Sequence, residues 1–137
     1  MNSKKILIFG VFDGIHDGHR YFINEAKKKG DHLVAVVARD SIVEKIKGKP
    51  PVNNEIERIK KLLEIPEIDL VFLGDGEMGV YNVIKEVKPD MIFLGYDQND
   101  LKKDLEKRIK SGELEKMEIS VCASYRPEEL HSSILNK

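Results

Sequence analysis

Short apolar runs recur along the chain at intervals that leave room for a helix between neighbouring runs. Four of them hold four to six consecutive hydrophobic residues: Ile6–Phe9, Leu33–Ala38, Leu70–Leu73 and Met91–Leu94. Runs that are apolar on both faces are typical of central strands in a parallel sheet that helices cover on both sides. A fifth run, Glu118–Ala123, alternates apolar and polar residues and predicts a strand nearer an edge.

The stretches between these runs have hydrophobic residues at helical spacing and polar residues at the expected ends of helices. In one of them Leu101, Leu105 and Ile109 lie four residues apart, which puts them on one face. The expected helices are Gly18–Lys29, one capped by Asp40 or Ser41 and running to Lys47, one capped by Asn53 or Asn54, Val80–Val87, Asp100–Lys110 and Pro127–Leu135. The helix after Asn54 is expected to carry on one face the apolar residues Ile56, Ile59, Leu62 and Leu63.

Strand and helix alternate throughout, which predicts an α/β fold. We expect one Rossmann-like, doubly wound domain over residues 1–137, with five parallel strands in the order 3-2-1-4-5. In such sheets ligands bind beyond the carboxyl ends of the strands, where the strand order reverses. Candidate chemistry is therefore sought in the loops that follow strands.

Composition narrows the classes of function. The 137 residues are 41% hydrophobic and 34% charged, as in globular proteins, and the net charge of −1 argues against nucleic-acid binding through bulk positive charge. No apolar run approaches the roughly 18 residues of a membrane span, and the first residues do not resemble a signal peptide. With Cys122 as the one cysteine, a reducing compartment fits, and we expect a cytoplasmic protein without a membrane partner.

The loop after the first predicted strand holds the densest chemistry. Gly10, Gly14 and Gly18 allow a ligand to approach the backbone closely, and the following helix begins with free N–H groups that suit an anion. His16 and His19 are three residues apart, so both imidazoles can face one phosphate and donate hydrogen bonds to it. The loop therefore predicts a phosphate site.

The loop has two other interpretations. The histidines are incidental in the first, one capping the helix and one in solvent. In the second they bind a metal with Asp17, but no further ligand or supporting residue lies nearby in the sequence. We therefore predict no protein-held metal.

The segments Gly10–Asp13 and His16–His19 resemble the GxFD and HxGH signatures of the cytidylyltransferase-like nucleotidyltransferases, and the similarity extends over nearly the whole chain. The resemblance implies that a phosphorylated acceptor attacks the α-phosphorus of a nucleoside triphosphate and expels pyrophosphate. It implies Mg²⁺ or another divalent cation as cofactor, held mainly by the substrate phosphates.

The resemblance also implies roles for the loop residues. His16 and His19 are expected to be catalytic and to hold the α-phosphate oxygens. Asp13 is expected either to fix the loop or to help hold the metal. The residues expected to bind the nucleotide here are Gly10, Val11, Phe12, Asp13 and Gly18.

Basic residues further along match positions that meet phosphates in similar proteins. Lys45 is expected to be catalytic and Lys47 to bind the nucleotide, although the pattern does not decide which of the two meets the phosphates. Arg58 is also expected in the nucleotide site. The alternative for Arg58 is an ion pair with Glu55 or Glu57.

On the far side of the expected site, Gly95 and Asp97 follow the fourth predicted strand. Asp97 suits a ribose hydroxyl or a base amine, and Tyr96 suits stacking, while a helix cap is the alternative for Asp97. Near the end of the chain, an arginine precedes a hydroxyl-rich segment, as in the family's last motif. The residues expected to bind the nucleotide there are Arg126, Ser132 and Ser133.

The details of the tail favour one branch of this family. His131–Ser132, together with the Gly-x-Asp-Gln segment before it, resembles the archaeal-type FAD synthases, which transfer AMP from ATP to FMN. The alternatives are CTP with glycerol 3-phosphate, ATP with a sugar phosphate, and a nucleotide-binding module without turnover. A homodimer is the ordinary expectation for the assembly.

A second glycine motif points to another class. Gly74–Gly79 reads G-x-G-x-x-G after a predicted strand, with Asp97 about 20 residues further on, as in dinucleotide-binding proteins. Asp75 and Glu77 would place negative charge beside a pyrophosphate, and only two strands follow. We therefore predict a plain turn here.

Overall fold

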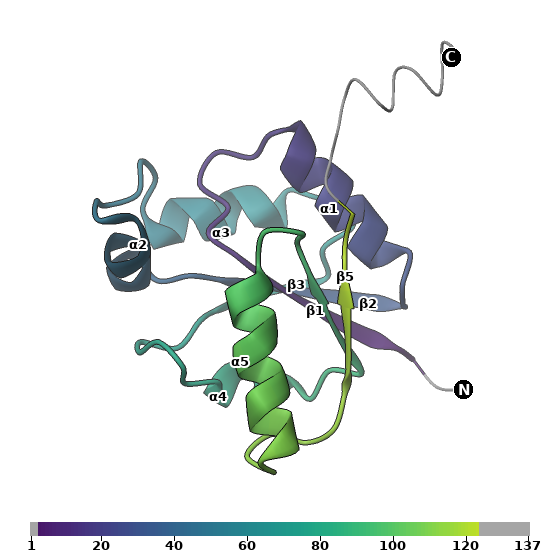
Figure 1. The fold of residues 1–137 in the computed structure, drawn as a ribbon. Coiled ribbons are helices and arrows are strands. Elements are labelled where there is room, and N and C mark those ends of the chain that lie inside the picture. Colours follow the sequence, from purple (N-terminus) through teal and green to yellow (C-terminus); the bar gives the residue numbers. More distant parts are fainter. Residues whose placement is uncertain (1–2, 124–137) are drawn as a thin grey trace, which may run out of the picture.

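Five parallel strands form one sheet in a computed structural model that describes residues 3–123 (Figure 1). The strands are β1 (Lys5–Gly10), β2 (His32–Val37), β3 (Leu70–Leu73), β4 (Met91–Leu94) and β5 (Glu118–Val121). The helices are α1 (Asp17–Lys27), α2 (Asp40–Lys47), α3 (Glu55–Leu63), α4 (Asn82–Val87) and α5 (Asn99–Lys110). Their order along the chain confirms the predicted alternation.

The sheet has the order β3-β2-β1-β4-β5, as predicted, with β1 in the middle. β1 pairs with β2 along its whole length, from Lys5↔His32 to Gly10↔Val37. It pairs with β4 over only two positions, Ile6↔Met91 and Leu7↔Ile92. The two strands therefore stop pairing before their carboxyl ends, at the place where the strand order reverses.

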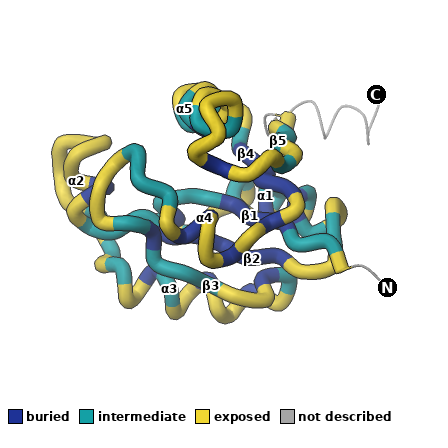
Figure 2. Tube along the Cα trace, turned by 90° about the horizontal axis from the view of Figure 1, so that it is seen from below, coloured by how far each residue is buried: buried dark blue, intermediate teal, exposed yellow. Residues whose placement is uncertain are grey.

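Alternate residues of the strands pack into two separate hydrophobic cores, one on each face of the sheet. Ile6 and Ile8 pack toward α1 and α3, in a cluster that includes Ile23 and Leu62. Leu7 belongs to the opposite cluster with residues of α4 and α5. Figure 2 shows the result, with buried segments along the central strands and exposed ones along the outer sides of the helices. This two-sided burial explains why the central strands have runs of consecutive apolar residues.

The edges of the sheet are less buried than its centre. β5 lies at one edge, as its alternating sequence predicted. β3 lies at the other edge, and Leu70 is 55% exposed there.

The apolar face predicted for α3 needs a correction. Ile56 and Leu63 are 56% and 57% exposed, while Leu62 is fully buried. Arg58 takes the buried position one helical turn before Leu62, so a charged residue belongs to the face that packs inward.

The N-terminal caps confirm the predicted start of α3 and correct that of α2. Asn54 caps α3, and its side chain accepts a hydrogen bond from the backbone N–H of Glu57. The N-cap of α2 is Arg39, whereas Asp40 or Ser41 was expected. The Asp40 carboxylate is bound to Arg58 and its backbone N–H to Glu55, so its side chain has a different partner from a cap.

Cys122 is buried and forms no disulfide, and its burial raises the pKa of the thiol. The helix predicted at Pro127–Leu135 lies outside the described residues. Within residues 3–123, none of the helices combines the length and the apolar composition that crossing a membrane requires.

Candidate active site

The loop that joins β1 to α1 is folded back on itself by a buried aromatic ring. Phe12 has a φ of +55° and its side chain is buried. A Cβ on Gly10 would lie 2.6 Å from atoms of the Phe12 ring, so Gly10 leaves the space that the ring fills. Gly14, with a φ of +79°, supplies the next bend. The chain then enters α1 directly above the carboxyl end of β1.

His16 and His19 together cap α1. The backbone N–H of Gly18 donates to Nδ1 of His16 at 3.0 Å, and the backbone N–H of His16 donates to Nδ1 of His19 at 3.2 Å. The ring centroids are 3.9 Å apart. Because Nδ1 is an acceptor in both rings, each neutral imidazole carries its proton on Nε2. Both Nε2 groups are thus donors beside the free N–H groups at the start of α1, which suits an anion.

The interpretation that one histidine caps α1 is therefore correct for His16, but His19 also takes part in the cap. Capping involves both rings, and it leaves a donor on each. Burial lowers the pKa of His19, and the neighbouring positive charges of His16 and Lys47 lower it further, while Asp97 acts in the opposite direction. The neutral form of His19 is consequently favoured over the charged form. The same interactions show that Lys47 and Asp97 lie within electrostatic reach of His19.

Asp13 fixes the loop. Its carboxylate accepts hydrogen bonds from the backbone N–H groups of Val52 and Asn53, at 2.7 and 2.9 Å, and from the side-chain amide of Asn53. Burial raises the pKa of Asp13, but these hydrogen bonds outweigh it and hold the pKa below its usual value. Of the two roles expected for Asp13, the structure supports the positioning role.

Arg58 occupies a different place from the expected one. Its side chain is completely buried, so it does not face an open phosphate site. The guanidinium donates to the carbonyl oxygens of Val11, at 2.8 Å, and Asn53, at 3.0 Å. It also pairs with Asp40 at 2.7 Å, where Glu55 or Glu57 was the expected partner. Arg58 therefore positions the backbone of the expected nucleotide-binding loop from the buried side of that loop.

The two lysines of α2 have different surroundings. The charge of Lys47 acts on His19. Lys45 lines an open hollow on α2 with Ser41, Glu44 and Gly48. The catalytic role expected of Lys45 stays a prediction.

The loop after β4 forms the other side of the site, and Tyr96 and Asp97 are exposed on it. A Cβ on Gly95 would lie 3.0 Å from Oδ1 of Asp97, which shows how tightly this turn folds. Gln98 is a residue that the sequence reasoning missed as a functional candidate. Its carboxamide bridges Gly95 and Phe9, and its place directly after Gly95–Asp97 was the available signal.

The second glycine motif is a turn, as predicted. It follows β3 at the edge of the sheet, away from the junction of β1 and β4. The carboxylate of Asp75 accepts a hydrogen bond from the backbone N–H of Val83 at 3.2 Å. A carboxylate thus lies at the start of α4, where a dinucleotide would place its pyrophosphate.

The described residues contain no group of three His, Cys, Asp or Glu side chains arranged to hold a metal. Both histidine Nδ1 atoms and the Asp13 carboxylate already have hydrogen-bond partners. Mg²⁺ keeps waters and phosphate oxygens as ligands and needs few from protein. The side chains present therefore fit a cation that arrives with a triphosphate.

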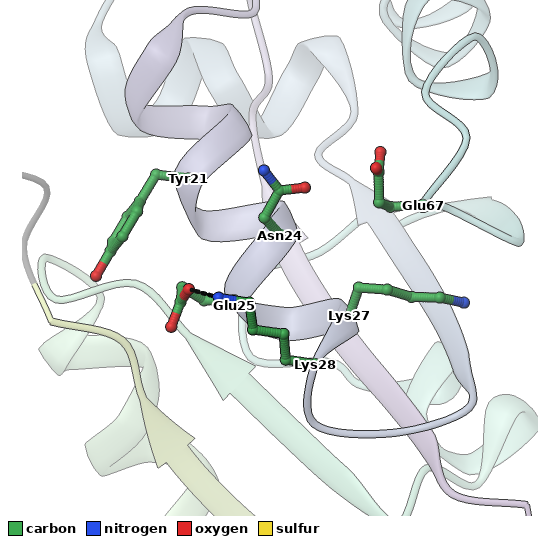
Figure 3. A pocket seen from close by; sticks show the side chains of 6 residues that line it. All are labelled: Tyr21, Asn24, Glu25, Lys27, Lys28 and Glu67. Carbon is green, nitrogen blue, oxygen red and sulfur yellow. Dashed lines mark hydrogen bonds and ion pairs between the residues drawn. The ribbon is translucent and has the colours of Figure 1, made fainter.

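A hollow elsewhere on the surface does not include the predicted site residues, and its volume is about 550 Å³. Figure 3 shows the side chains that line it along α1: Tyr21, Asn24, Glu25, Lys27, Lys28 and Glu67. Arg126, Ser132 and Ser133, expected to bind the nucleotide, lie outside the described residues.

Comparisons with known proteins agree with this geometry. The model of the cytidylyltransferase-like family matches residues 7–137. The FAD synthase of Aciduliprofundum boonei is 43% identical over 102 residues, which span 74% of this chain and 67% of that protein. The FAD synthase of Pyrococcus horikoshii is 43% identical over 108 residues, or 78% and 72% of the two chains.

A solved structure is also similar over most of its length. It is described as the lipopolysaccharide core biosynthesis protein of Thermoplasma volcanium, and it superposes with a TM-score of 0.80 at 36% sequence identity. The match covers 91% of this chain and all of that one. The fold and the arrangement of strands are therefore shared with a protein of related sequence.

Replacing Arg58 by Met should destabilise the protein strongly. The change leaves the carbonyl oxygens of Val11 and Asn53 and the Asp40 carboxylate without their donor, which we expect to cost about 3 kcal/mol of unfolding free energy. Urea denaturation measures this loss. Lys60→Met on the exposed side of the same helix is the control, and an equal effect of the two substitutions would contradict the positioning role of Arg58.

The free energy of unfolding should decrease as the pH is lowered, because His19 binds a proton more readily in the unfolded chain. Its pKa is lowered in the folded state from the usual 6.5, so the unfolded chain binds the proton more readily. This contribution is present above pH 6.5 and is lost as the pH falls through the lowered pKa. Unfolding free energies across this range should be compared with those of His19→Gln, which keeps an acceptor at the third helical position. An equally steep decline in His19→Gln would refute the assignment.

Proposed function

Because this chain belongs to the cytidylyltransferase-like family, we propose that it transfers a nucleoside monophosphate from a nucleoside triphosphate to a small phosphorylated acceptor. We propose ATP as the nucleotide and FMN as the acceptor, which gives FAD and pyrophosphate. The observation that carries the proposal is the pair of imidazoles beside the start of α1, each with a free Nε2 donor. This pair lies where β1 and β4 separate, the usual ligand position in a sheet of this topology.

The reaction needs positioning and charge stabilisation more than covalent help from the protein. An oxygen of the acceptor phosphate attacks the α-phosphorus, and the bond from that phosphorus to the oxygen bridging to the β-phosphorus breaks. The electron pair leaves with pyrophosphate. His16 and His19 would donate from Nε2 to the α-phosphate oxygens as negative charge gathers there. Donation requires only the Nε2 proton, so a neutral ring is sufficient for this role.

Other residues would hold the rest of the nucleotide. Lys47 would attract the phosphates next to His19, and Lys45 is the alternative lysine for this role. The backbone from Gly10 to Phe12 would line the nucleotide, and Asp97 would accept from the ribose or the base. In the tail, we propose phosphate contacts from Arg126, Ser132 and Ser133.

A divalent cation, most simply Mg²⁺, would accompany the triphosphate and shield its charge. Its ligands would come mainly from phosphate oxygens and water. A homodimer and a cytoplasmic location stay predictions from the sequence.

The choice of ATP and FMN rests on the two archaeal relatives that are named FAD synthases. The solved structure with 36% identity carries a different description, lipopolysaccharide core biosynthesis, and keeps a sugar-phosphate acceptor as the second candidate. Glycerol 3-phosphate with CTP is the alternative within the family. A module that binds nucleotide without turnover would not need two donors aimed at one phosphate.

Pyrophosphate release tests these choices directly. The purified chain with Mg²⁺ is given ATP or CTP, each with FMN, glycerol 3-phosphate or a hexose 1-phosphate, and the flavin product is followed by chromatography. We expect pyrophosphate and FAD in equal amounts from ATP with FMN alone. Turnover only with CTP and glycerol 3-phosphate would replace the proposed substrates. Nucleotide binding without pyrophosphate from any pair would point to the binding module.

Loss of either imidazole should lower kcat with ATP and FMN about 100-fold, the usual effect of removing one donor to developing charge. His16→Asn tests this well because asparagine still caps a helix but has no imidazole Nε2 donor. His19→Ala tests the second ring. His32→Ala, at the exposed start of β2, is the control and should leave kcat unchanged. Full activity in His16→Asn would show that His16 acts only as a cap.

A further inference from the structure

The strands β1 and β4 leave a gap in the hydrogen-bond ladder of the sheet. Their last paired residues are Leu7 and Ile92. The carbonyl of Phe9 and the N–H of Gly95 lie beyond that point, near the carboxyl ends of the two strands. Main-chain groups in such a position need partners from elsewhere, since a buried unpaired group is costly. The gap therefore has to be bridged by a side chain or by water.

Gln98 bridges this gap. Its Nε2 donates to the carbonyl oxygen of Phe9 at 3.0 Å, and its Oε1 accepts from the N–H of Gly95 at 2.7 Å. Its own backbone N–H donates to the carbonyl oxygen of Gly95 at 3.1 Å, which closes the turn. A primary amide is suited to this place because it offers one donor and one acceptor at the end of the same side chain.

The bridge joins the two loops that form the proposed site. Phe9 directly precedes the loop of Gly10 and the two histidines, and Gly95 begins the turn that carries Asp97. This turn is tight, since a Cβ on Gly95 would meet Oδ1 of Asp97 at 3.0 Å. The position of Asp97 relative to His19, on which its charge acts, thus depends on how β4 is held against β1.

We propose that Gln98 is a positioning residue for the nucleoside end of the triphosphate. Its amide sets the separation between Asp97, on the β4 side, and the phosphate-binding histidines, on the β1 side. The inference rests on the proposed function in so far as the bound molecule is a nucleotide. Gln98 does not touch the reacting atoms, so its loss weakens nucleotide binding far more than it slows the bound complex.

Two variants separate the parts of the bridge. Gln98→Met has a similar length and loses both hydrogen bonds, and Gln98→Glu keeps the acceptor but turns a carboxylate oxygen toward the Phe9 carbonyl. Calorimetric titration with ATP and with CTP, without acceptor, gives the Kd of the nucleotide that binds. We expect Kd and KM to rise about tenfold in both variants, with kcat within about threefold of the wild type. Asn99→Asp, which adds a charge one residue further along, is the control and should bind as the wild type does.

The pH dependence of the nucleotide Kd distinguishes the positioning role from general destabilisation of the protein. A protonated glutamic acid at position 98 again has a donor for Phe9. The Kd ratio of Gln98→Glu to wild type should therefore shrink toward one as the pH falls from about 8 to about 5.5. The same ratio for Gln98→Met should stay constant over this range.

Either of two results would overturn the proposal: a lower melting temperature with wild-type Kd in Gln98→Met, or a pH-independent Kd ratio in Gln98→Glu. Circular dichroism checks folding first. If neither variant folds, Gly95→Ala displaces Asp97 while the Gln98 side chain stays, and a wild-type Kd there would equally refute the inference. If the wild type binds nucleotide but transfers nothing to FMN, the proposed function fails and the binding comparison still decides the role of Gln98.

Discussion

The site depends on one buried guanidinium. Arg58 is fully buried on α3, and it holds three segments at once: the loop after β1 through Val11, the loop before α3 through Asn53, and the start of α2 through Asp40. A buried cation is tolerated only when its donors are satisfied, so these segments must keep the geometry that satisfies it. No buried side-chain nitrogen or oxygen among residues 3–123 lacks a partner. The charge therefore acts as a fixed point around which the loops are arranged.

Asp13 holds the same two loops together through the other backbone group of Asn53. Arg58 donates to the carbonyl of Asn53, and Asp13 accepts from the N–H of the same residue. The loop after β1 and the loop before α3 are thereby cross-linked by charges of both signs. With the backbone fixed in this way, His16 and His19 can use Nδ1 for the cap of α1 and keep Nε2 for a ligand. The cap and the anion site are consequently one structure, and a change in either alters the other.

Most of the fold could be predicted because it follows from local pattern. Apolar runs marked the strands, and the glycines and histidines after Ile6–Phe9 marked the site. The parts that could not be predicted depend on contacts between distant residues. Arg58 was expected to face the nucleotide, yet it binds the carbonyl of Val11, 47 positions away, and its burial leaves Ile56 and Leu63 exposed. Gln98 reads as a polar turn residue, and its role depends on how far β1 and β4 pair.

The distribution of charge around the site also depends on contacts that local sequence pattern does not show. The sequence predicted that basic side chains would supply the positive potential that a triphosphate needs. In the structure, Arg58 is paired with Asp40. Beside the histidines lie Lys47, whose charge acts on His19, the Nε2 donors of the two rings and the partial charge at the start of α1. Such dipolar groups attract phosphate oxygens strongly only at short range, because their fields fall off faster with distance than that of a full charge. The site is therefore better suited to holding a phosphate that is already in position than to collecting anions from solution. That is consistent with a cation travelling with the substrate and with a net charge close to zero.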